Sequence, residues 1–319
     1  MSEVYSVVRT VQFRTPLKWN DKIKDYRDLV NYFIDYGLKN NVTSYRRLRQ
    51  ENYDYLRKEY SDFLSHYILT SAQIASRLLK SHRRLLRMWK KGEIKEKPSK
   101  PVFKKLGILL DETTFSFRIE GDEIEFSLNY FGKRIKFRKK IHKHFRKYLN
   151  QGYRISRQPI LKPRKGKIYL LLPLRKDVKV KECRNILTVD VNLNNVTWFN
   201  SGKIKQVLTF EQRIRTAYYL KYRRMQLKIT KLDKRKRVYR KSKRDIRTAS
   251  KTSTTKLLTE RTNSAIVIED LSEIRNSIDY GSKINGILHK WSFRKFQEIL
   301  EEKAKERGIP VKRVNPSYT

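Results

Sequence analysis

Basic residues run through this whole chain, and their excess limits what the chain can fold into. Its 319 residues include 76 Lys plus Arg against 32 Asp plus Glu, which gives a formal net charge of +44. A compact chain with this charge repels itself, so we expect a polyanion to neutralise it. Nucleic acid fits this expectation, because its phosphates are regularly spaced and release counterions when they are bound. A membrane surface is the alternative, but the charge is not confined to one amphipathic helix or tail.

Apolar content and cysteine usage exclude several classes of protein. Hydrophobic residues make up 38% of the chain, which is too much for a disordered protein and suits two or three modest domains. The single cysteine, Cys183, excludes a disulfide framework and any four-cysteine zinc site, so no zinc is expected in this chain. No apolar stretch approaches the roughly 18 residues of a membrane span. The start, MSEVYSVVRTVQF, alternates like a strand and does not resemble a signal peptide. We therefore expect an intracellular protein with no membrane partner.

Hydrophobic periodicity predicts the domain organisation. Residues 3–14 alternate as a strand, and residues 21–91 have the spacing of three helices, the first ending near Gly37. Turn signals then separate several strands within residues 102–178. We predict a β-barrel formed by residues 1–20 and 102–180, with a helical bundle of residues 21–101 inserted into it. Residues 181–319 mix strands with helices and are predicted to form an α/β domain.

Two acids stand at the ends of apolar strands in the last domain. Asp190 ends the predicted strand 186–190, and Glu269 ends the predicted strand 264–269. In open α/β sheets, ligands bind at the carboxyl ends of the strands. Two carboxylates brought together there repel each other unless a cation lies between them, and Mg²⁺ prefers such oxygen ligands. The pattern predicts a metal-dependent phosphodiester-cleaving site at Asp190 and Glu269. For either acid alone, capping a helix or pairing with Lys is the alternative.

Three groups of basic residues are predicted to face nucleic acid. They lie on the outer face of the third helix, in a tight turn between two strands, and in the basic run of residues 231–247. The alternative for such a run is a solvated face, or a helix that binds a partner protein. The predicted nucleic-acid-binding residues are Arg83, Arg84, Arg87, Lys90, Arg164, Lys165, Arg235, Lys236, Arg237, Arg240 and Arg244.

Around the two acids, the sequence resembles the TnpB (OrfB-type) family of transposon-encoded, RNA-guided nucleases, which are relatives of the type V CRISPR effectors. TVDVNLNNVTWF resembles the first RuvC motif, and IVIEDLSEIR resembles the second. WSFRKFQEILEEKAKERGIPVKRVNPSYT resembles the segment before the zinc ribbon of the family. The resemblance implies an α+β multidomain fold with a β-barrel wedge domain (1–20 and 102–180), a helical recognition bundle (21–101) and an incomplete RNase H-like (RuvC) domain (181–319).

The resemblance also implies a function. Members of the family bind a guide RNA, pair it with double-stranded target DNA and cut that DNA at one RuvC site, so base pairing supplies the sequence recognition. Asp190 and Glu269 match the first two metal-binding acids, and Mg²⁺ is the implied cofactor. The implied location is cytoplasmic, at the nucleoid of a prokaryote, in the context of an insertion sequence and its transposition.

The sequence departs from the family pattern at its C-terminal end. That pattern continues past residue 319 with a four-cysteine zinc ribbon and a third acidic motif, so we expect the 319-residue chain alone to cleave little. The chain is then a truncated reading frame, a degenerate copy, or a fragment completed by a separate C-terminal segment or a full-length partner, and the sequence does not decide among these. The sequence leaves open whether Asp270, Glu211 or Asp279 supplies a further ligand. It also leaves open a non-catalytic RNA- or DNA-binding module, an RNA-guided repressor, or a basic RNA-binding protein of the ribosomal sort.

Overall fold

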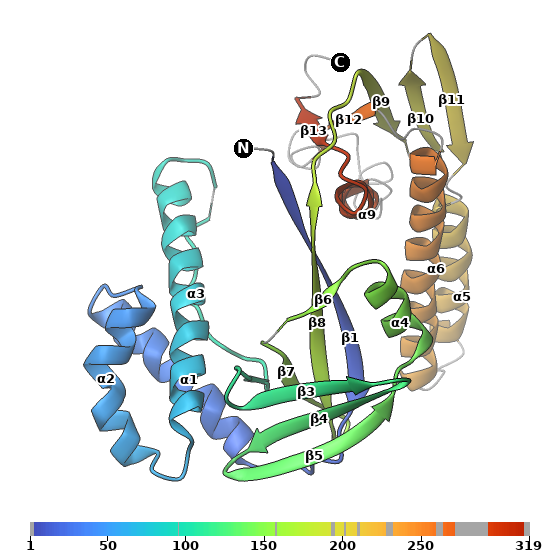
Figure 1. Cartoon of the computed structure of the whole chain (residues 1–319). Coiled ribbons are helices and arrows are strands. Elements are labelled where there is room, and N and C mark those ends of the chain that lie inside the picture. Colours follow the sequence, from blue (N-terminus) through green and yellow to red (C-terminus); the bar gives the residue numbers. More distant parts are fainter. Residues whose placement is uncertain are drawn as a thin grey trace. The chain divides into compact units, whose positions relative to one another are not determined.

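The chain folds into two compact units that mix helices with sheets. The computed structural model describes residues 3–94, 96–156, 158–192, 195–200, 202–208, 211–227, 232–259, 264–271 and 293–315. One unit consists of Met1–Val7 and Asp177–Thr319, and the other of Val8–Lys176. Figure 1 shows the helices and strands of both units. The α+β class predicted from the sequence is confirmed.

Three helices form a bundle in the Val8–Lys176 unit: α1 (Lys22–Lys39), α2 (Tyr45–Glu59) and α3 (Ser65–Lys90). Apolar residues spaced three and four apart bury one face of each helix, as the periodicity predicts. Helix α1 ends at Lys39, two residues after Gly37 and so near the predicted end, and Gly37 itself lies in its last turn. A Cβ at Gly37 would meet the Leu79 side chain and the Val42 carbonyl oxygen, so glycine allows α1 and α3 to pack closely.

The strands of this part of the chain pair as two sheets. The five-stranded sheet contains β1 (Val4–Arg14), β8 (Lys167–Lys179), β7 (Ile160–Arg164) and β2 (Ile108–Leu109) in that order, and β6 (Arg154–Ile155) also pairs with β8. The antiparallel three-stranded sheet contains β3 (Phe115–Glu120), β4 (Glu123–Tyr130) and β5 (Lys133–Lys140). Helix α4 (Lys143–Asn150) follows β5. The closed barrel stays a prediction.

The other unit contains a second five-stranded sheet, in the order β11-β10-β9-β12-β13. The strands are β9 (Asn185–Val191), β10 (Asn195–Asn200), β11 (Lys203–Leu208), β12 (Ser264–Glu269) and β13 (Val311–Val314). Its helices are α5 (Glu211–Leu227), α6 (Leu232–Thr259) and α9 (Phe293–Lys305). Alternate residues of β9 and β12, such as Val189 and Ile268, form a buried core together with Leu257 of α6 and Leu300 of α9.

The basic run of residues 231–247 is not an irregular connection. From Leu232 onward it forms the first turns of α6, which continues to Thr259. Most of its Lys and Arg side chains are exposed. None of the helices within the described ranges has the length and apolarity needed to cross a lipid bilayer.

A side-chain hydrogen bond joins α3 to the turn before β3. Nδ1 of His66 lies 2.5 Å from Oδ2 of Asp111, whose Oδ1 accepts hydrogen bonds from the backbone amides of Thr113 and Thr114. Burial opposes ionisation of Asp111, but the hydrogen bonds from His66 and Thr114 outweigh it and lower the pKa of this carboxyl. The charged form of Asp111 therefore stabilises the folded state.

Asp111→Asn is expected to lower the free energy of unfolding by about 1–3 kcal/mol at neutral pH, because a charged acceptor of several hydrogen bonds is lost. A carboxyl with a lowered folded-state pKa stabilises the fold above its unfolded-state pKa, which is about 3.9, and loses that effect as the pH falls through the folded-state value. The difference between wild type and variant should therefore shrink below about pH 4. Urea denaturation at several pH values measures it, and a difference that is constant down to the acid limit would contradict this assignment.

Gly308 closes the turn between α9 and β13. Its φ is +73°, which favours glycine, and a Cβ there would meet the carbonyl oxygen of Lys179. The Gly308 carbonyl oxygen accepts a hydrogen bond of 2.8 Å from the Lys181 amide. This contact ties the segment that leads into β9 to the segment that leads into β13.

Gly308→Ala is expected to lower the free energy of unfolding by more than about 1 kcal/mol, because both the backbone conformation and the close approach exclude a methyl group. Gly202→Ala is the matched control, since Gly202 has a φ of +80° but open space around it. Chemical denaturation should show a clearly larger loss at Gly308 than at Gly202. Equal losses would mean that the contact with Lys179 is unimportant.

Candidate metal site and nucleic-acid interface

Parallel pairing of β9 with β12 brings the two predicted acids together. The register pairs Leu187 with Ile266 and Val189 with Ile268. Asp190 and Glu269 are the next residues on the two strands, so they lie side by side where the strands end. Neighbouring strands are about 4.8 Å apart. The two acids are therefore on adjacent strands of one sheet, as the sequence predicts.

The two acids also share a face of the sheet. Val189 and Ile268 point into the core, so the residues that follow them point to the opposite face. Asp190 is exposed and Glu269 is half-buried. Both line a pocket of about 240 Å³, which we call the carboxylate pocket. Its lining residues are Thr188, Val189, Asp190, Thr197, Trp198, Phe199, Ile204, Val267, Ile268, Glu269 and Val314.

Two amide side chains that the sequence did not single out support these acids. Nδ2 of Asn192 donates a hydrogen bond of 2.7 Å to Oδ2 of Asp190. Nε2 of Gln297, which is fully buried on α9, donates one of 2.7 Å to the backbone carbonyl oxygen of Glu269. The signal for Gln297 is a polar residue directly beside Phe296, in the apolar stripe of an amphipathic helix. These contacts hold the ends of both strands.

Asp270 has a different environment from Glu269. Its amide donates a hydrogen bond of 2.7 Å to the carbonyl oxygen of Val314, and its Oδ1 lies 3.6 Å from Nη1 of Arg313. Nε of Arg313 also donates a hydrogen bond of 2.7 Å to Glu301, which raises the pKa of the guanidinium despite its partial burial. Asp270 therefore belongs to an ion-pair group with Arg313 and Glu301. The side chain of Glu211 and all of Asp279 lie outside what the structure describes.

The donor set of the carboxylate pocket fits a magnesium ion. Mg²⁺ is commonly held by one or two carboxylates and completes its shell with water and substrate phosphate oxygens. Asp190 and Glu269 supply two carboxylates at an open pocket. Among the described residues there is no group of three or more His, Cys, Asp or Glu side chains placed to hold a metal. The pocket can thus hold an ion only if other oxygens complete the coordination.

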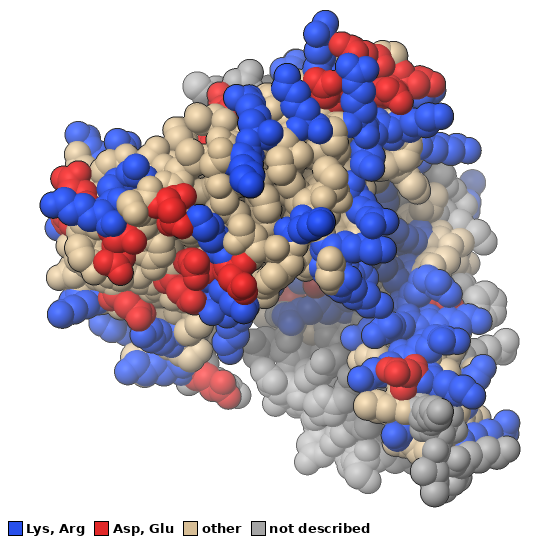
Figure 2. All heavy atoms as spheres, turned by 90° about the horizontal axis from the view of Figure 1, so that it is seen from below, with Lys and Arg blue, Asp and Glu red and all other residues tan. Residues whose placement is uncertain are grey.

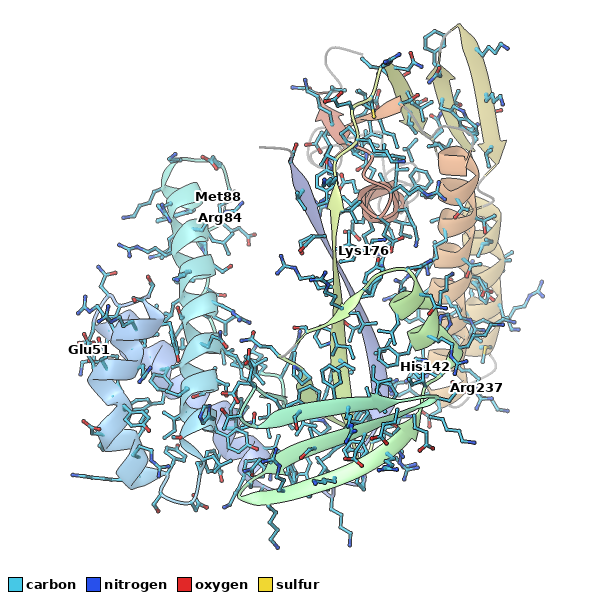
Figure 3. All side chains as sticks on the ribbon, in the orientation of Figure 1. Glu51, Arg84, Met88, His142, Lys176 and Arg237 are labelled. Atoms are coloured by element: carbon cyan, nitrogen blue, oxygen red, sulfur yellow. The ribbon has the colours of Figure 1, made fainter. Side chains whose placement is uncertain are left out.

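The predicted nucleic-acid-binding residues fall on three surfaces. Arg83, Arg84, Arg87 and Lys90 are exposed on the last turns of α3, and Figure 3 shows Arg84 one turn from Met88 there. Arg164 and Lys165 are exposed in the turn between β7 and β8.

The third surface lies on α6. Lys236, Arg237, Arg240 and Arg244 are exposed there, and Figure 3 labels Arg237. Arg235 is half-buried, and its Nε is buried with no hydrogen-bond partner among the residues that the structure describes. Arg244 lies 3.8 Å from Asp245.

Basic side chains are not confined to these residues. Figure 2 shows Lys and Arg side chains over the face that it presents, with acidic side chains among them. Several acids of the chain pair with neighbouring bases, for example Glu125 with Arg138 at 2.8 Å and Asp122 with Arg146. Such exposed pairs contribute little to stability, and the excess of positive charge remains.

The fold and the pocket together define an α+β protein with two strand-end carboxylates and a strongly basic surface. Comparison with known proteins finds two relatives of this chain. Over 204 residues, which are 59% of this chain and 73% of the relative, the chain is 31% identical to the uncharacterized protein MJ0857 of Methanocaldococcus jannaschii. The chain belongs to the same family as MJ0857.

A second relative is described as a TnpB-like protein. The chain is 30% identical to the TnpB-like protein MJ0751 of the same organism over 165 residues, 47% of this chain and 59% of that protein. The resemblance to the TnpB family is thereby confirmed, because this chain is similar to a protein described as TnpB-like. Residues 22–127 also match the family described as the uncharacterized protein MJ0013 family.

Two solved structures show a weak overall likeness. One is the cryo-EM structure of the Cas12f1–sgRNA–target DNA complex, with a TM-score of 0.34, 13% identity and coverage of 97% of this chain and 85% of that chain. The other is the Cas12i1 R-loop complex after target DNA cleavage, with a TM-score of 0.40, 9% identity and coverage of 96% and 54%. TM-scores in this range lie below those that indicate a common fold.

Proposed function

We propose that this chain acts as a TnpB-like, RNA-guided DNA endonuclease component that binds guide RNA and double-stranded target DNA, with Mg²⁺ held by Asp190 and Glu269. The observation that carries the proposal is the placement of these two carboxylates side by side on β9 and β12, in one pocket. The net charge of +44 supports a polyanionic partner. The similarity to a TnpB-like relative supports the class of activity.

The finer fold assignment is part of the same proposal. In the β11-β10-β9-β12-β13 sheet, three consecutive strands pair antiparallel, and two later strands add parallel to β9. This order supports an RNase H-like (RuvC) domain over residues 181–319. The five-stranded and three-stranded sheets support a wedge domain formed by residues 1–20 and 102–180, and α1 to α3 support a recognition bundle over residues 21–101.

Each part of the site has a defined role in this proposal. A bound Mg²⁺ would polarise the scissile phosphate and lower the pKa of a bound water. Asp190 and Glu269 offer oxygen ligands from two rigid strands, and the hydrogen bond from Asn192 orients the Asp190 carboxylate. Gln297 holds the backbone at the end of β12. The exposed arginines of α3 and α6 bind phosphates, so RNA pairing is left to supply the sequence recognition.

A non-catalytic role is the second candidate. Each ligand helps to neutralise and position a metal ion, so a site with few ligands holds the ion weakly. The described part of the carboxylate pocket offers two carboxylates. We therefore propose that cleavage by this chain alone is weak or absent. In that case the chain acts as an RNA- and DNA-binding module or as an RNA-guided repressor.

Metal binding tests the assignment of the pocket. Asp190→Asn and Glu269→Gln are each expected to weaken Mn²⁺ binding, measured by electron paramagnetic resonance with a short DNA duplex present, by at least about tenfold, because each removes a charged ligand. Asp270→Asn is the matched control and should bind Mn²⁺ like the wild type, since Asp270 faces Arg313. Wild-type binding in both pocket variants would rule out the site, as would any Mg²⁺-dependent DNA cleavage that survives Asp190→Ala.

The salt dependence of RNA binding tests the basic surface. The logarithm of the affinity should fall steeply with the logarithm of the salt concentration, and Arg84→Gln or Arg87→Gln should reduce the slope by about 0.7–0.9 each, because each removes one phosphate contact. Arg27→Gln is the control, since Arg27 already pairs with Asp28 at 2.8 Å. Fluorescence anisotropy over a salt series measures the slopes. A nearly flat dependence in the wild type would overturn the electrostatic account.

A further inference from the structure

The hairpin of α5 and α6 carries a pocket that the proposed function does not use. The two helices lie side by side and antiparallel (Figure 1). Between them is a pocket of about 430 Å³, a size typical of pockets that bind small organic groups. We call it the tyrosine pocket, and its lining residues are Tyr218, Tyr219, Tyr222, Gln226, Val238, Tyr239 and Ser242.

Helical spacing explains why these side chains meet. Tyr218, Tyr222 and Gln226 follow one another at intervals of four residues along α5, so they share one face. Val238 and Ser242 are likewise four residues apart on α6. The Tyr218 hydroxyl donates a hydrogen bond across the hairpin to Asp245, and this bond holds the Tyr218 side chain in the wall of the pocket. The same hydrogen bond raises the pKa of Tyr218.

The lining chemistry suits a flat aromatic ligand with polar edges. Tyr222 is half-buried, whereas 56% of Tyr239 is exposed, so both helices offer an aromatic ring to the pocket. Aromatic side chains stack on nucleobases with little sequence preference, because every base has a π-face. Gln226 offers amide donors and an acceptor, and Ser242 offers a hydroxyl, which can meet the polar edge of such a ring.

The positive charge around the tyrosine pocket favours flat ligands that carry negative charge. Nζ of Lys243 lies 4.6 Å from the centre of the Tyr239 ring. Exposed basic residues of α6 flank the lining residues on both sides: Lys236, Arg237, Arg240, Lys241 and Lys243. A ligand with an aromatic ring attached to negative charge therefore fits better than a neutral aromatic compound or an apolar protein side chain.

We propose that the tyrosine pocket binds an unpaired nucleobase of a single-stranded nucleic acid, while the basic side chains of α6 hold the phosphates on either side of that base. This inference rests on the nucleic-acid binding proposed above and adds a site that recognises strands with unpaired bases. It does not depend on the carboxylate pocket, which lies on the sheet of the same unit.

The test compares oligonucleotides with and without bases. The probes are a short oligothymidylate and an abasic oligonucleotide with the same number of phosphates, both labelled for fluorescence anisotropy. Wild type is expected to bind the oligothymidylate roughly 5- to 100-fold more tightly than the abasic strand, because base stacking adds to the phosphate contacts. In the double variant Tyr222→Leu/Tyr239→Leu this preference should disappear, while affinity for the abasic strand and the salt slope stay unchanged. An oligouridylate arm reports whether the pocket takes RNA and DNA alike.

Two single variants test whether the lost preference comes from the tyrosine pocket or from a loss of folding. Tyr239→Leu alone changes a mostly exposed side chain and should lose part of the preference with an unchanged thermal melting curve. Tyr55→Leu is the matched control, because Tyr55 on α2 is similarly exposed, at 57%, and lies in the other unit. It should keep the full preference for the base-containing strand.

Each contrary result has its own meaning. If wild type binds both strands equally, the tyrosine pocket does not bind bases, although the nucleic-acid function stands. If wild type binds neither strand, both proposals fail. If the double variant keeps its oligonucleotide affinity but loses a dimer in sedimentation experiments, the pocket is a contact between copies of the chain, and this proposal is overturned.

Discussion

The parallel register of β9 and β12 is the constraint on which the candidate metal site depends. Side chains on a strand alternate between faces, so a slip of one residue would send Glu269 into the core and Ile268 into the pocket. The apolar residues of both strands prevent that slip, because Leu187, Val189, Ile266 and Ile268 must all remain buried. Ordinary core packing thus fixes the position of two acids that come from distant parts of the chain.

The excess of positive charge has a different relation to the fold. Several acidic residues pair with basic ones, as Glu125 does with Arg138 and Glu301 with Arg313. These pairs leave exposed cations on α3, on α6 and in the turn between β7 and β8. Burial of apolar residues stabilises the units, whereas most of the charge remains available for phosphates.

Much of this arrangement could be predicted from the sequence because it follows from local periodicity. Short apolar runs identified β9 and β12, helical spacing identified α1 to α3, and the two acids stand at the ends of those apolar runs. Features that depend on contacts between distant residues could not be predicted. Gly37 has the sequence signal of a helix end, and it is also a packing position against Leu79. The pairing of Asp270 with Arg313 and the support of Glu269 by Gln297 depend on how α9 and β13 pack onto β12. The tyrosine pocket needs two helices to meet, although the spacing of Tyr218 and Tyr222 was a usable signal.

The hydrogen bond between Lys181 and Gly308 has a consequence for how this sheet can change. It joins the chain just before β9 to the chain just before β13, at the end of the strands opposite to Asp190 and Glu269. Because β9, β12 and β13 run parallel, backbone hydrogen bonds hold these strands at both ends: this one where they begin, and the bond from the Asp270 amide to the Val314 carbonyl oxygen where they end. Removing the carboxyl group of Asp190 or Glu269 therefore leaves in place the backbone contacts that hold the ends of the strands.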